Sequence, residues 1–432
     1  MKRPPSFFAA PGTSAEGSTG SDTGAEQGTL RARVGDLEFI VADAFEKVEM
    51  EPAEWDRAVE RLGGAVYMTW DWLRTWWEFY GNGCRLRLMI FLKDGEIVGL
   101  LPLYLQRLGL RPLQLTIARL VGANIPPKVF DPPLHAECSA ECMHLALERL
   151  HRDGCGLLSL GPVSDEFADA HANLESTWQA CLRWDVRKVS AGVYTWFALP
   201  DIFEAYLSSL GKNEQKNRRK YELRMMRKEY EVRVQVLGRN GEALNEAFEE
   251  FACLHTAQWR AEGLPGHFGA WPRGLEYNRA LIQAQARHGR ARLLRILANG
   301  RTVCAQYAFA WSDRWFWELP AREVSPEWDR FSLGPTGIVV MIQEAIREGR
   351  KRIEGGLGHY PYKLRLGALE RPVWIYRFSC RSPQERIRRW SARSVRLLLQ
   401  WGYHKLWYRR IQPRLPERWK RPQWSLWLRH DF

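Results

Sequence analysis

The segment Ser332–Gly337 reads Ser-Leu-Gly-Pro-Thr-Gly and has the composition of a backbone site for an anion. Glycine lets the main chain approach a ligand closely, and unpaired amides at the start of a helix attract phosphate oxygens. Pro335 suits the first turn of a helix, and apolar residues recur at helical spacing directly after it. The segment lacks the lysine of a Walker loop, so an ordinary helix start with good caps is the alternative interpretation.

A second candidate for chemistry is the run from Glu354 to Lys363. It places three glycines within four residues directly after a predicted strand, a pattern typical of close backbone approach to a ligand. Four side chains that titrate or form hydrogen bonds follow the glycines: His359, Tyr360, Tyr362 and Lys363. The alternative is a flexible turn from strand to helix with aromatic residues on the surface.

A third candidate is the run from Lys212 to Arg233, which holds nine basic and four acidic residues. A run of this kind usually forms the solvated face of a helix. Because it precedes the two candidates above, it is also suited to lining a site for an anionic substrate or for RNA. The sequence leaves these interpretations open.

Two similar segments, some 205 residues apart, must help to position these groups. Residues 85–103 and 291–309 each contain an apolar run, then Asp94-Gly95 or Asn299-Gly300, then a second apolar run. Both dipeptides tolerate the positive φ angles of a type I′ turn, so each segment is predicted to be a β-hairpin. Each hairpin follows a tryptophan-bearing helical stretch. The repetition predicts a duplicated α/β domain, with copies at residues 36–193 and 194–380.

The second copy has the clearer order of elements. Residues 314–319 are predicted to form a strand, residues 320–333 an irregular loop, and residues 338–348 a helix that Gly349 ends. A short strand at 351–354, a glycine loop, a helix at 362–369 and a closing strand at 372–379 follow. In the first copy, 138–151 are predicted to be helical and 157–160 to form a strand. The candidate groups therefore lie where strands and helices of one α/β unit meet.

Residues 195–380 resemble the GNAT-type acyltransferase domain of bacterial proteins linked to cellulose and exopolysaccharide biosynthesis, the CelD-like group. The shared features are the basic helix around Arg218, Trp259 with Gly263, the Asn299-Gly300 hairpin, Ser332–Gly337, the helix end at 345–349, the glycines of 354–358 and the Tyr362-Lys363 pair. That group is related to the Fem-type peptidoglycan aminoacyltransferases, which also pair two such domains, and a weaker likeness covers the first half. The resemblance implies an α/β (α+β) fold of two tandem GNAT-like domains, with mixed, mainly antiparallel sheets flanked by helices.

The resemblance also implies a reaction, in which acetyl-CoA or another acyl-CoA, as donor substrate and without a metal, acylates an amine. The acceptor would be a sugar, a polysaccharide precursor or an envelope intermediate. The residues implied at the donor pyrophosphate are Arg330, Ser332, Leu333, Gly334, Thr336 and Gly337. The sequence departs from the usual pattern Gln/Arg-x-x-Gly-x-Gly/Ala, because Arg330 and Gly334 align only with one extra residue. A Fem-like aminoacyl-tRNA donor and a non-catalytic scaffold of an envelope-polysaccharide assembly therefore stay open.

N-acyl transfer needs a base for the ammonium proton, donors for the oxyanion and an acid for the leaving thiol. Glu318, at the end of its predicted strand among aromatic residues, is the first candidate base, with a surface carboxylate on an edge strand as the alternative. Tyr360 or Tyr362 is the candidate acid, and His359 is an alternative base. The substrate-binding candidates are Trp259, Gly356, Gly358, Lys363 and Arg218.

The formal charge of +13 is concentrated at one end of the chain. Residues 381–432 hold 14 Lys or Arg and 3 Asp or Glu, together with 6 of the 21 tryptophans. Between residues 386 and 411, apolar side chains lie near one helical face and arginines flank them. A basic amphipathic tail of this kind suits an anionic membrane surface. Packing on the protein's own surface and binding of nucleic acid are the alternatives.

The remaining composition bounds the class of protein. A chain of 432 residues with 45% hydrophobic content can bury a sizeable core in two or three domains. No stretch reaches the ~18 apolar residues of a membrane span, and residues 1–35 are predicted to be a disordered leader without a signal peptide. The expected location is cytoplasmic, with a peripheral position at the inner face of the plasma membrane as the variant that the basic tail would favour. Cys138 and Cys142 have helical spacing, so we expect them to pack in a core rather than bind zinc.

Overall fold

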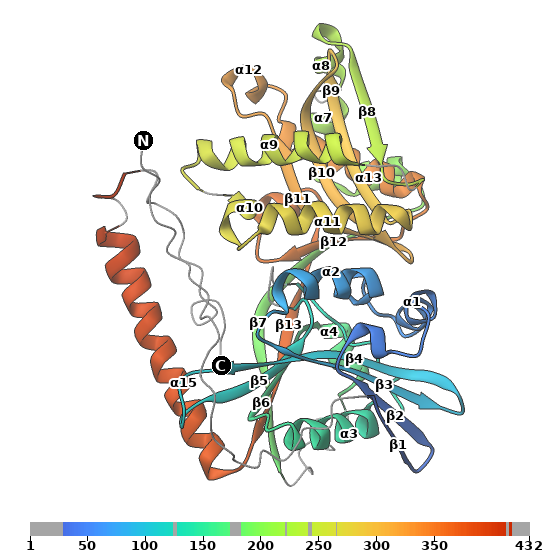
Figure 1. Ribbon diagram of the computed structural model, residues 1–432. Coiled ribbons are helices and arrows are strands. Elements are labelled where there is room, and N and C mark those ends of the chain that lie inside the picture. Colours follow the sequence, from blue (N-terminus) through green and yellow to red (C-terminus); the bar gives the residue numbers. More distant parts are fainter. Residues whose placement is uncertain are drawn as a thin grey trace, which may run out of the picture.

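The computed structural model describes residues 29–123, 128–172, 183–220, 223–240, 244–264, 266–411 and 414–416. Within them, thirteen strands form one sheet in the order β1-β2-β3-β4-β5-β6-β13-β7-β12-β11-β10-β9-β8 (Figure 1). The strands are β1 Leu30–Val34, β2 Leu37–Ala42, β3 Arg85–Lys93, β4 Glu96–Leu108, β5 Leu115–Leu120, β6 Leu157–Ser164, β7 Trp184–Ala198, β8 Val232–Leu237, β9 Ala291–Ala298, β10 Arg301–Trp311, β11 Arg314–Arg322, β12 Arg352–Leu357 and β13 Leu369–Cys380. We call β1–β6 with their helices the first half, and β8–β12 with theirs the second half.

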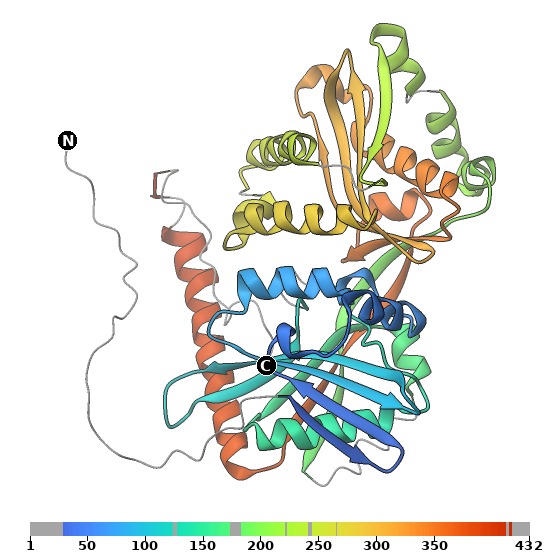
Figure 2. The ribbon, with the colours of Figure 1, turned by 45° about the vertical axis from the view of Figure 1, so that its right-hand side comes forward.

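Helices flank the sheet in both halves, as Figures 1 and 2 show. The first half carries α1 Pro52–Arg61, α2 Trp70–Tyr80, α3 Ser139–Arg152, α4 Asp165–Ala170 and the 3-10 turns η1 Phe45–Lys47 and η2 Val66–Met68. The second half carries α6 Phe203–Ser209, α7 Lys212–Lys220, α8 Leu223–Glu229, α9 Asn245–Ala261, α10 Gly266–Ala270, α11 Gly274–Arg287, α12 Pro326–Asp329, α13 Leu333–Arg347 and α14 Pro361–Arg365. Helix α15 (Pro383–Trp401) and the π-helical segment η3 (Gly402–Ile411) follow β13. The predicted α/β fold, a mixed sheet flanked by helices, is confirmed.

The two predicted hairpins are present and repeat each other in detail. Asp94 and Gly95 have φ angles of 51° and 81°, and Asn299 and Gly300 have 49° and 80°, as a type I′ turn requires. Three residues after each glycine, Val98 and Val303 are skipped in the pairing of their hairpins, so both hairpins carry a bulge at the same place. Each half also contains one parallel pair among its described strands, β5 with β6 and β11 with β12.

The halves exchange their last strands. β7 follows the first half in sequence, yet its residues 194–198 pair with β12 of the second half. β13 follows the second half and pairs with β6 of the first, while β7 and β13 pair with each other along most of their length. The expected boundary between residues 193 and 194 therefore lies inside the continuous strand β7, which Figure 1 shows running from one half to the other.

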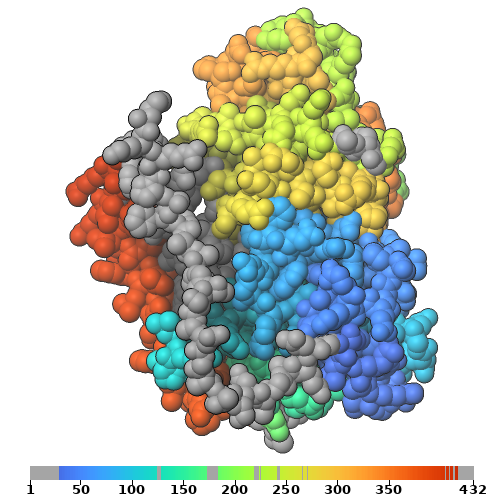
Figure 3. All heavy atoms as spheres, in the orientation of Figure 1, coloured from blue at the N-terminus to red at the C-terminus, as the bar shows by residue number. Residues whose placement is uncertain are grey.

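The halves also share one hydrophobic core. The rings of Trp72 on α2 and Phe309 on β10 lie 5.0 Å apart, edge to face. Arg290 Nη2 donates to Asp56 Oδ2 over 2.6 Å, and Gln285 donates to Thr69 over 3.4 Å. Figure 3 shows the first half (blue) in continuous contact with α11 (yellow). Residues more than 200 positions apart in the sequence thus form one packed unit.

Some sequence-based element predictions were wrong in detail. Residues 30–34, assigned to the leader, form β1, because they pair with β2 in register from Leu30 with Val41 to Val34 with Leu37. Gly355, Gly356 and Leu357 continue β12 rather than forming a loop, since β7 pairs with Gly356 and Leu357 and skips Gly355 at a bulge. Residues 1–28, predicted to be disordered, lie outside the described residues. No helix of the described chain is long and apolar enough to span a bilayer.

Candidate functional site

The parallel strands β11 and β12 separate after a short contact. Residues 314–316 pair with residues 352–354, and no register continues beyond them. The outer edges stay paired, β11 with β10 and β12 with β7. Residues 317–322 and 355–357 therefore face each other across what we call the β11–β12 gap. No neighbouring strand pairs with the backbone along this edge, although side chains already bond the Gly355, Gly356 and Pro320 carbonyls and the Arg322 amide. The remaining backbone groups can bond a ligand.

Lys363, on α14, reaches into the β11–β12 gap. Its Nζ donates to the carbonyl oxygen of Gly355 over 2.6 Å and lies 4.6 Å from the ring centre of Trp317 and 4.2 Å from that of Tyr360. The residue is 6% exposed, and burial lowers the pKa of its ammonium to about 8. No carboxylate of the described chain pairs with Lys363. A buried cation without an anionic partner is a favourable place for a ligand phosphate or carboxylate.

The start of α13 lies beside the end of β11. Ser332 adopts a left-handed conformation (φ 46°) directly before the helix, and a methyl group added at Gly334 would lie 3.7 Å from Arg322 Cδ. The amides of the first helical turn have no acceptor within the helix. Pro335 has no N–H and the amide of Thr336 bonds to Ser332, so the free amides are those of Leu333 and Gly334. With Arg322 beside them, they form a small positive site.

Three other residues predicted to bind the donor have structural partners. Thr336 is fully buried, and its hydroxyl donates to the Phe331 carbonyl. A methyl group at Gly337 would lie 2.5 Å from Cys304 Sγ, so this glycine allows α13 to pack on β10. Arg330 forms an ion pair with Glu229 on α8. This ion pair directs the Arg330 side chain toward α8.

Glu318 occupies a bulge in β11. Tyr307 of β10 pairs with Leu319 and the next residue pairs with Trp317, so Glu318 is the extra residue. Its side chain is 6% exposed, accepts a hydrogen bond from Tyr67 Oη over 3.1 Å and forms an ion pair with Lys128. Both partners come from the first half. The alternative of a surface carboxylate on an edge strand is wrong, because β10 and the first half enclose this side chain.

A pair of histidines lies near the end of β11. His255 on α9 is fully buried, with Nδ1 2.7 Å from the Pro320 carbonyl oxygen and Nε2 3.1 Å from His267 Nδ1. Burial lowers the pKa of His255, which favours the neutral imidazole. Trp259, predicted to bind substrate, stacks edge to face on His267 with ring centres 5.0 Å apart. This aromatic cluster forms the wall of the site on the α9–α10 side.

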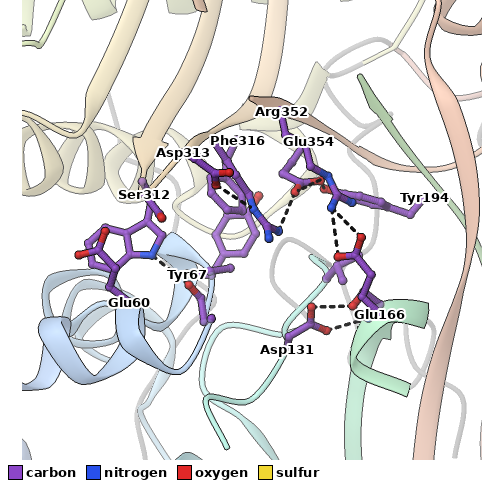
Figure 4. A pocket seen from close by; sticks show the side chains of 17 residues that line it. Glu60, Tyr67, Asp131, Glu166, Tyr194, Ser312, Asp313, Phe316, Arg352 and Glu354 are labelled. Atoms are coloured by element: carbon purple, nitrogen blue, oxygen red, sulfur yellow. Dashed lines mark hydrogen bonds and ion pairs between the residues drawn. The ribbon is translucent and has the colours of Figure 1, made fainter. Parts of the chain in front are cut away.

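A pocket lies between the two halves (Figure 4). Its cavity volume is about 70 Å³, and Tyr67 and Phe316, in its wall, have ring centres 5.2 Å apart. Five carboxylates line it, against two guanidinium groups: Glu60, Asp131, Glu166, Asp313 and Glu354, with Arg314 and Arg352. Glu318 does not line the pocket itself, but Tyr67, in the pocket wall, connects the two by its hydrogen bond to Glu318.

Two of these carboxylates, Glu354 and Asp131, are fixed by hydrogen bonds or ion pairs with neighbouring residues. Glu354 accepts a hydrogen bond from the hydroxyl of Tyr194 and lies 3.0 Å from Arg314 Nη1 and 2.9 Å from Arg352 Nε. Asp131 accepts from the amide of Ser164 over 2.7 Å, and burial raises its pKa to about 6. The surplus of carboxylates over guanidinium groups suits a positively charged ligand group rather than a phosphate.

The remaining predicted residues lie outside this pocket. His359 is 60% exposed and pairs with Glu370 over 2.8 Å, on the far side of β12. Tyr360 and Tyr362 flank Lys363, and burial raises the pKa of Tyr362 to about 12. Gly356 and Gly358 have φ angles of 87° and 116°, which glycine alone adopts readily. Arg218 belongs to α7, and its side chain lies outside the described residues.

Sequence reasoning missed Tyr67, Lys128, His255 and His267. None stands in a motif, and the first two lie 251 and 190 positions from Glu318. Only His255 carries a local signal, since it lies four residues before Trp259 on the same helix. Tyr67 and Lys128 reach the site through the contact between the halves, and His267 reaches it through the packing of α10 on α9.

Comparison with known protein families shows that residues 212–364 match the family described as "Acetyltransferase (GNAT) domain". The crystal structure of FemX has a TM-score of 0.55 at 10% identity, covering 76% of this chain and 96% of that one. L-PGS from Bacillus licheniformis (TM-score 0.44, 12% identity, 78% and 95% covered) and a tandem GNAT protein from the clavulanic acid biosynthesis pathway (0.38, 12%, 80% and 99%) also match. A search of the curated proteins gave no match. At these identities, the likeness to FemX shows the fold alone.

Proposed function

Starting from the GNAT acyltransferase domain of residues 212–364, we propose that the protein transfers an acyl group from an activated donor to a primary amine held between its halves. The observation that carries the proposal is the arrangement of β11. One side of this strand meets Lys363 in the β11–β12 gap, and its bulge holds Glu318, which is linked to the acidic pocket by the hydrogen bond from Tyr67. A donor in the gap and an amine in the pocket would meet at this strand.

The positive groups at the gap support an anionic donor. Lys363, Arg322 and the free amides of Leu333 and Gly334 would hold phosphate groups, while the edge of β11 would bond the chain that carries the acyl group. Acetyl-CoA or another acyl-CoA is the donor that we propose first. The donor supplies the activated acyl carbon, and the protein supplies binding and orientation.

The acidic pocket supports an amine acceptor. A primary amine arrives as an ammonium ion, which the surplus of carboxylates around Asp131 and Glu354 would attract. We place this amine on a sugar, a polysaccharide precursor or an envelope intermediate, on the strength of the resemblance to the CelD-like group. The cavity accepts only the amine end of such a molecule, since its volume is small.

The chemistry follows from these positions. The ammonium gives a proton to Glu318 through the hydroxyl of Tyr67, and the free amine attacks the acyl carbon. A C–N bond forms and the nitrogen loses its second proton to solvent, while the donor's C–S bond breaks and the leaving thiolate takes a proton. Tyr362, whose pKa is raised to about 12, stays protonated at neutral pH and is the acid that we propose.

An aminoacyl-tRNA donor is the second candidate. Pro335 removes one amide from the first turn of α13, and Thr336 uses another within the helix, so only two amides are free for a pyrophosphate. A ribose ester with a single adjacent phosphate needs fewer such contacts than CoA does. The leaving group would then be the ribose hydroxyl, and the steps on the acceptor side would be the same.

Calorimetric titration of the full chain with acetyl-CoA tests the donor. We expect binding at pH 7 that weakens about fivefold between pH 8 and pH 9, because Lys363 loses its charge above a pKa of about 8. The variant Lys363→Met should bind more weakly with a flat pH profile, whereas Lys351→Met, at an exposed lysine, should behave as the wild type. Absence of binding to any acyl-CoA, with binding of aminoacyl-tRNA, would favour the second candidate. Absence of both would favour a scaffold.

A further inference from the structure

Helix α15 directs large apolar side chains away from the protein. Ile387, Trp390, Leu397, Leu398 and Trp401 are 57%, 72%, 51%, 69% and 58% exposed. At ~100° per residue, these five positions fall within an arc of about 100° around the helix. They therefore form one continuous apolar stripe, and we call it the α15 stripe.

The opposite side of α15 attaches the helix to the protein. Ala392 is 3% exposed and packs with Leu108 and Leu115 of the first half. Arg389 Nη1 donates to the carbonyls of Gly156 and Cys380 over 3.1 and 2.8 Å. A surface helix normally turns its apolar face to the core. Helix α15 thus packs on the protein's own surface, as one alternative expected, but it does so through a narrow, partly polar side, and no described residue covers the α15 stripe.

The charges around the α15 stripe have one sign. Residues 383–411 contain eight Lys or Arg and a single acidic residue, Glu385, which pairs with Arg388. Arg386 and Arg393 are exposed and border the stripe on the side of Leu397. An apolar stripe with tryptophans and an arginine border matches a bilayer surface, where apolar groups enter the acyl boundary and cations meet anionic headgroups.

A loop that neighbours α15 also exposes apolar side chains. The tip of the β4–β5 hairpin presents Leu110, 86% exposed, and Leu113, 43% exposed, with Arg111 between them. The hairpin lies beside α15 in both ribbon views, as the packing of Ala392 on Leu108 and Leu115 requires (Figures 1 and 2). The tip therefore repeats the combination of exposed leucine and arginine next to the helix.

We propose that α15 and the β4–β5 tip dock the protein on the surface of a bilayer that contains anionic lipids. The surface lies outside the acyl-transfer site, so the proposal does not depend on the donor or the acceptor. A second copy of the chain is disfavoured as the occupant, because two α15 helices would bring their arginine borders together. Protein interfaces are also depleted in charge at their core.

Co-sedimentation of the full chain with vesicles tests this proposal. The protein should bind vesicles of phosphatidylcholine with phosphatidylglycerol, bind pure phosphatidylcholine weakly, and dissociate as ionic strength rises. The double variant Trp390→Ser/Trp401→Ser should lower the bound fraction by at least about fivefold, because it removes the stripe's anchors. Ile202→Ser, at a residue that is 63% exposed outside α15, is the matched control and should bind as the wild type.

Thermal melting of the variants shows that they are folded. The proposal is overturned if the wild-type chain does not bind anionic vesicles, or if the double variant binds them as well as the wild type does. It is also overturned if the chain forms a dimer without lipid and the double variant is a monomer, since the stripe would then be an interface between copies. Arg386→Gln/Arg393→Gln should lower binding to anionic vesicles and leave binding to neutral ones unchanged.

Discussion

Glu318 shows how one extra residue in a strand changes the chemistry of a site. Without the bulge, residues 318 and 319 would point to opposite faces of the sheet. The bulge lets Glu318 meet Tyr67 and Lys128, while Leu319 packs against the core shared with the first half. β5 of the first half pairs with β4 without a register shift. Since β5 is the counterpart of β11, the first half has no bulge that could present a carboxylate in the way that β11 presents Glu318.

Replacing this carboxylate tests its role as a base. Glu318→Gln keeps an acceptor for Tyr67 but cannot take a proton, so we expect kcat for amine acylation to fall at least ~100-fold with little change in donor affinity. Steady-state kinetics and donor titration measure the two effects separately. Glu327→Gln, at an exposed carboxylate on α12, should keep full activity. An unchanged kcat in Glu318→Gln would assign the base to another residue.

At the scale of elements, two glycines of α13 have different roles. A methyl group at Gly337 would approach Gln306 Nε2 to 2.4 Å and Cys304 Sγ to 2.5 Å, whereas at Gly334 the nearest atom is 3.7 Å away. Gly337 is therefore needed where the helix crosses β10. Gly334 lies at the free start of the helix, where a ligand would approach.

Alanine at each glycine separates packing from binding. We expect Gly337→Ala to lower the free energy of unfolding by about 1–3 kcal/mol, because α13 must move away from β10. Gly334→Ala should unfold like the wild type but bind the donor more weakly, because the methyl group covers the free amides. Urea denaturation and donor titration measure the two effects. Equal destabilisation by both substitutions would contradict this division.

At the scale of the whole molecule, the exchange of β7 and β13 joins the halves more firmly than a linker would. Each half contributes its last strand to the centre of the sheet, and α2 packs on α11 across a shared core. The pocket, walled by both halves, depends on this arrangement. Neither half would form the candidate site alone.

Cooperative unfolding follows from this architecture. Leu147→Ala in α3 and Met341→Ala in α13 each remove a fully buried side chain from a different half. Each should lower the stability of the whole protein by about 2–5 kcal/mol within a single transition. Circular dichroism in the far and near ultraviolet, followed through urea denaturation, measures this. Two separate transitions in either variant would show that the halves unfold independently.

Residue types at turns, helix ends and titratable positions predicted much of the fold and part of the candidate site. Asp94-Gly95 and Asn299-Gly300 identified both hairpins, because few other residues tolerate positive φ at successive positions. Pro335 and Gly349 marked the start and end of α13 for similar steric reasons. Glu318 and Lys363 stood out as titratable groups among aromatic residues, and the structure places both beside β11. Arg330 was a less useful guide, since Glu229 holds it away from the start of α13.

Turn geometry, helix caps and hydrophobic periodicity act over a few residues, so the sequence by itself determined the repeated α/β units and the amphipathic character of α15. Tertiary structure decided which distant residues meet. It brought Tyr67 and Lys128 to Glu318, exchanged β7 with β13, and docked α15 through Ala392, which leaves its apolar stripe exposed. These outcomes depend on packing between segments up to about 250 positions apart, and no local pattern encodes such contacts.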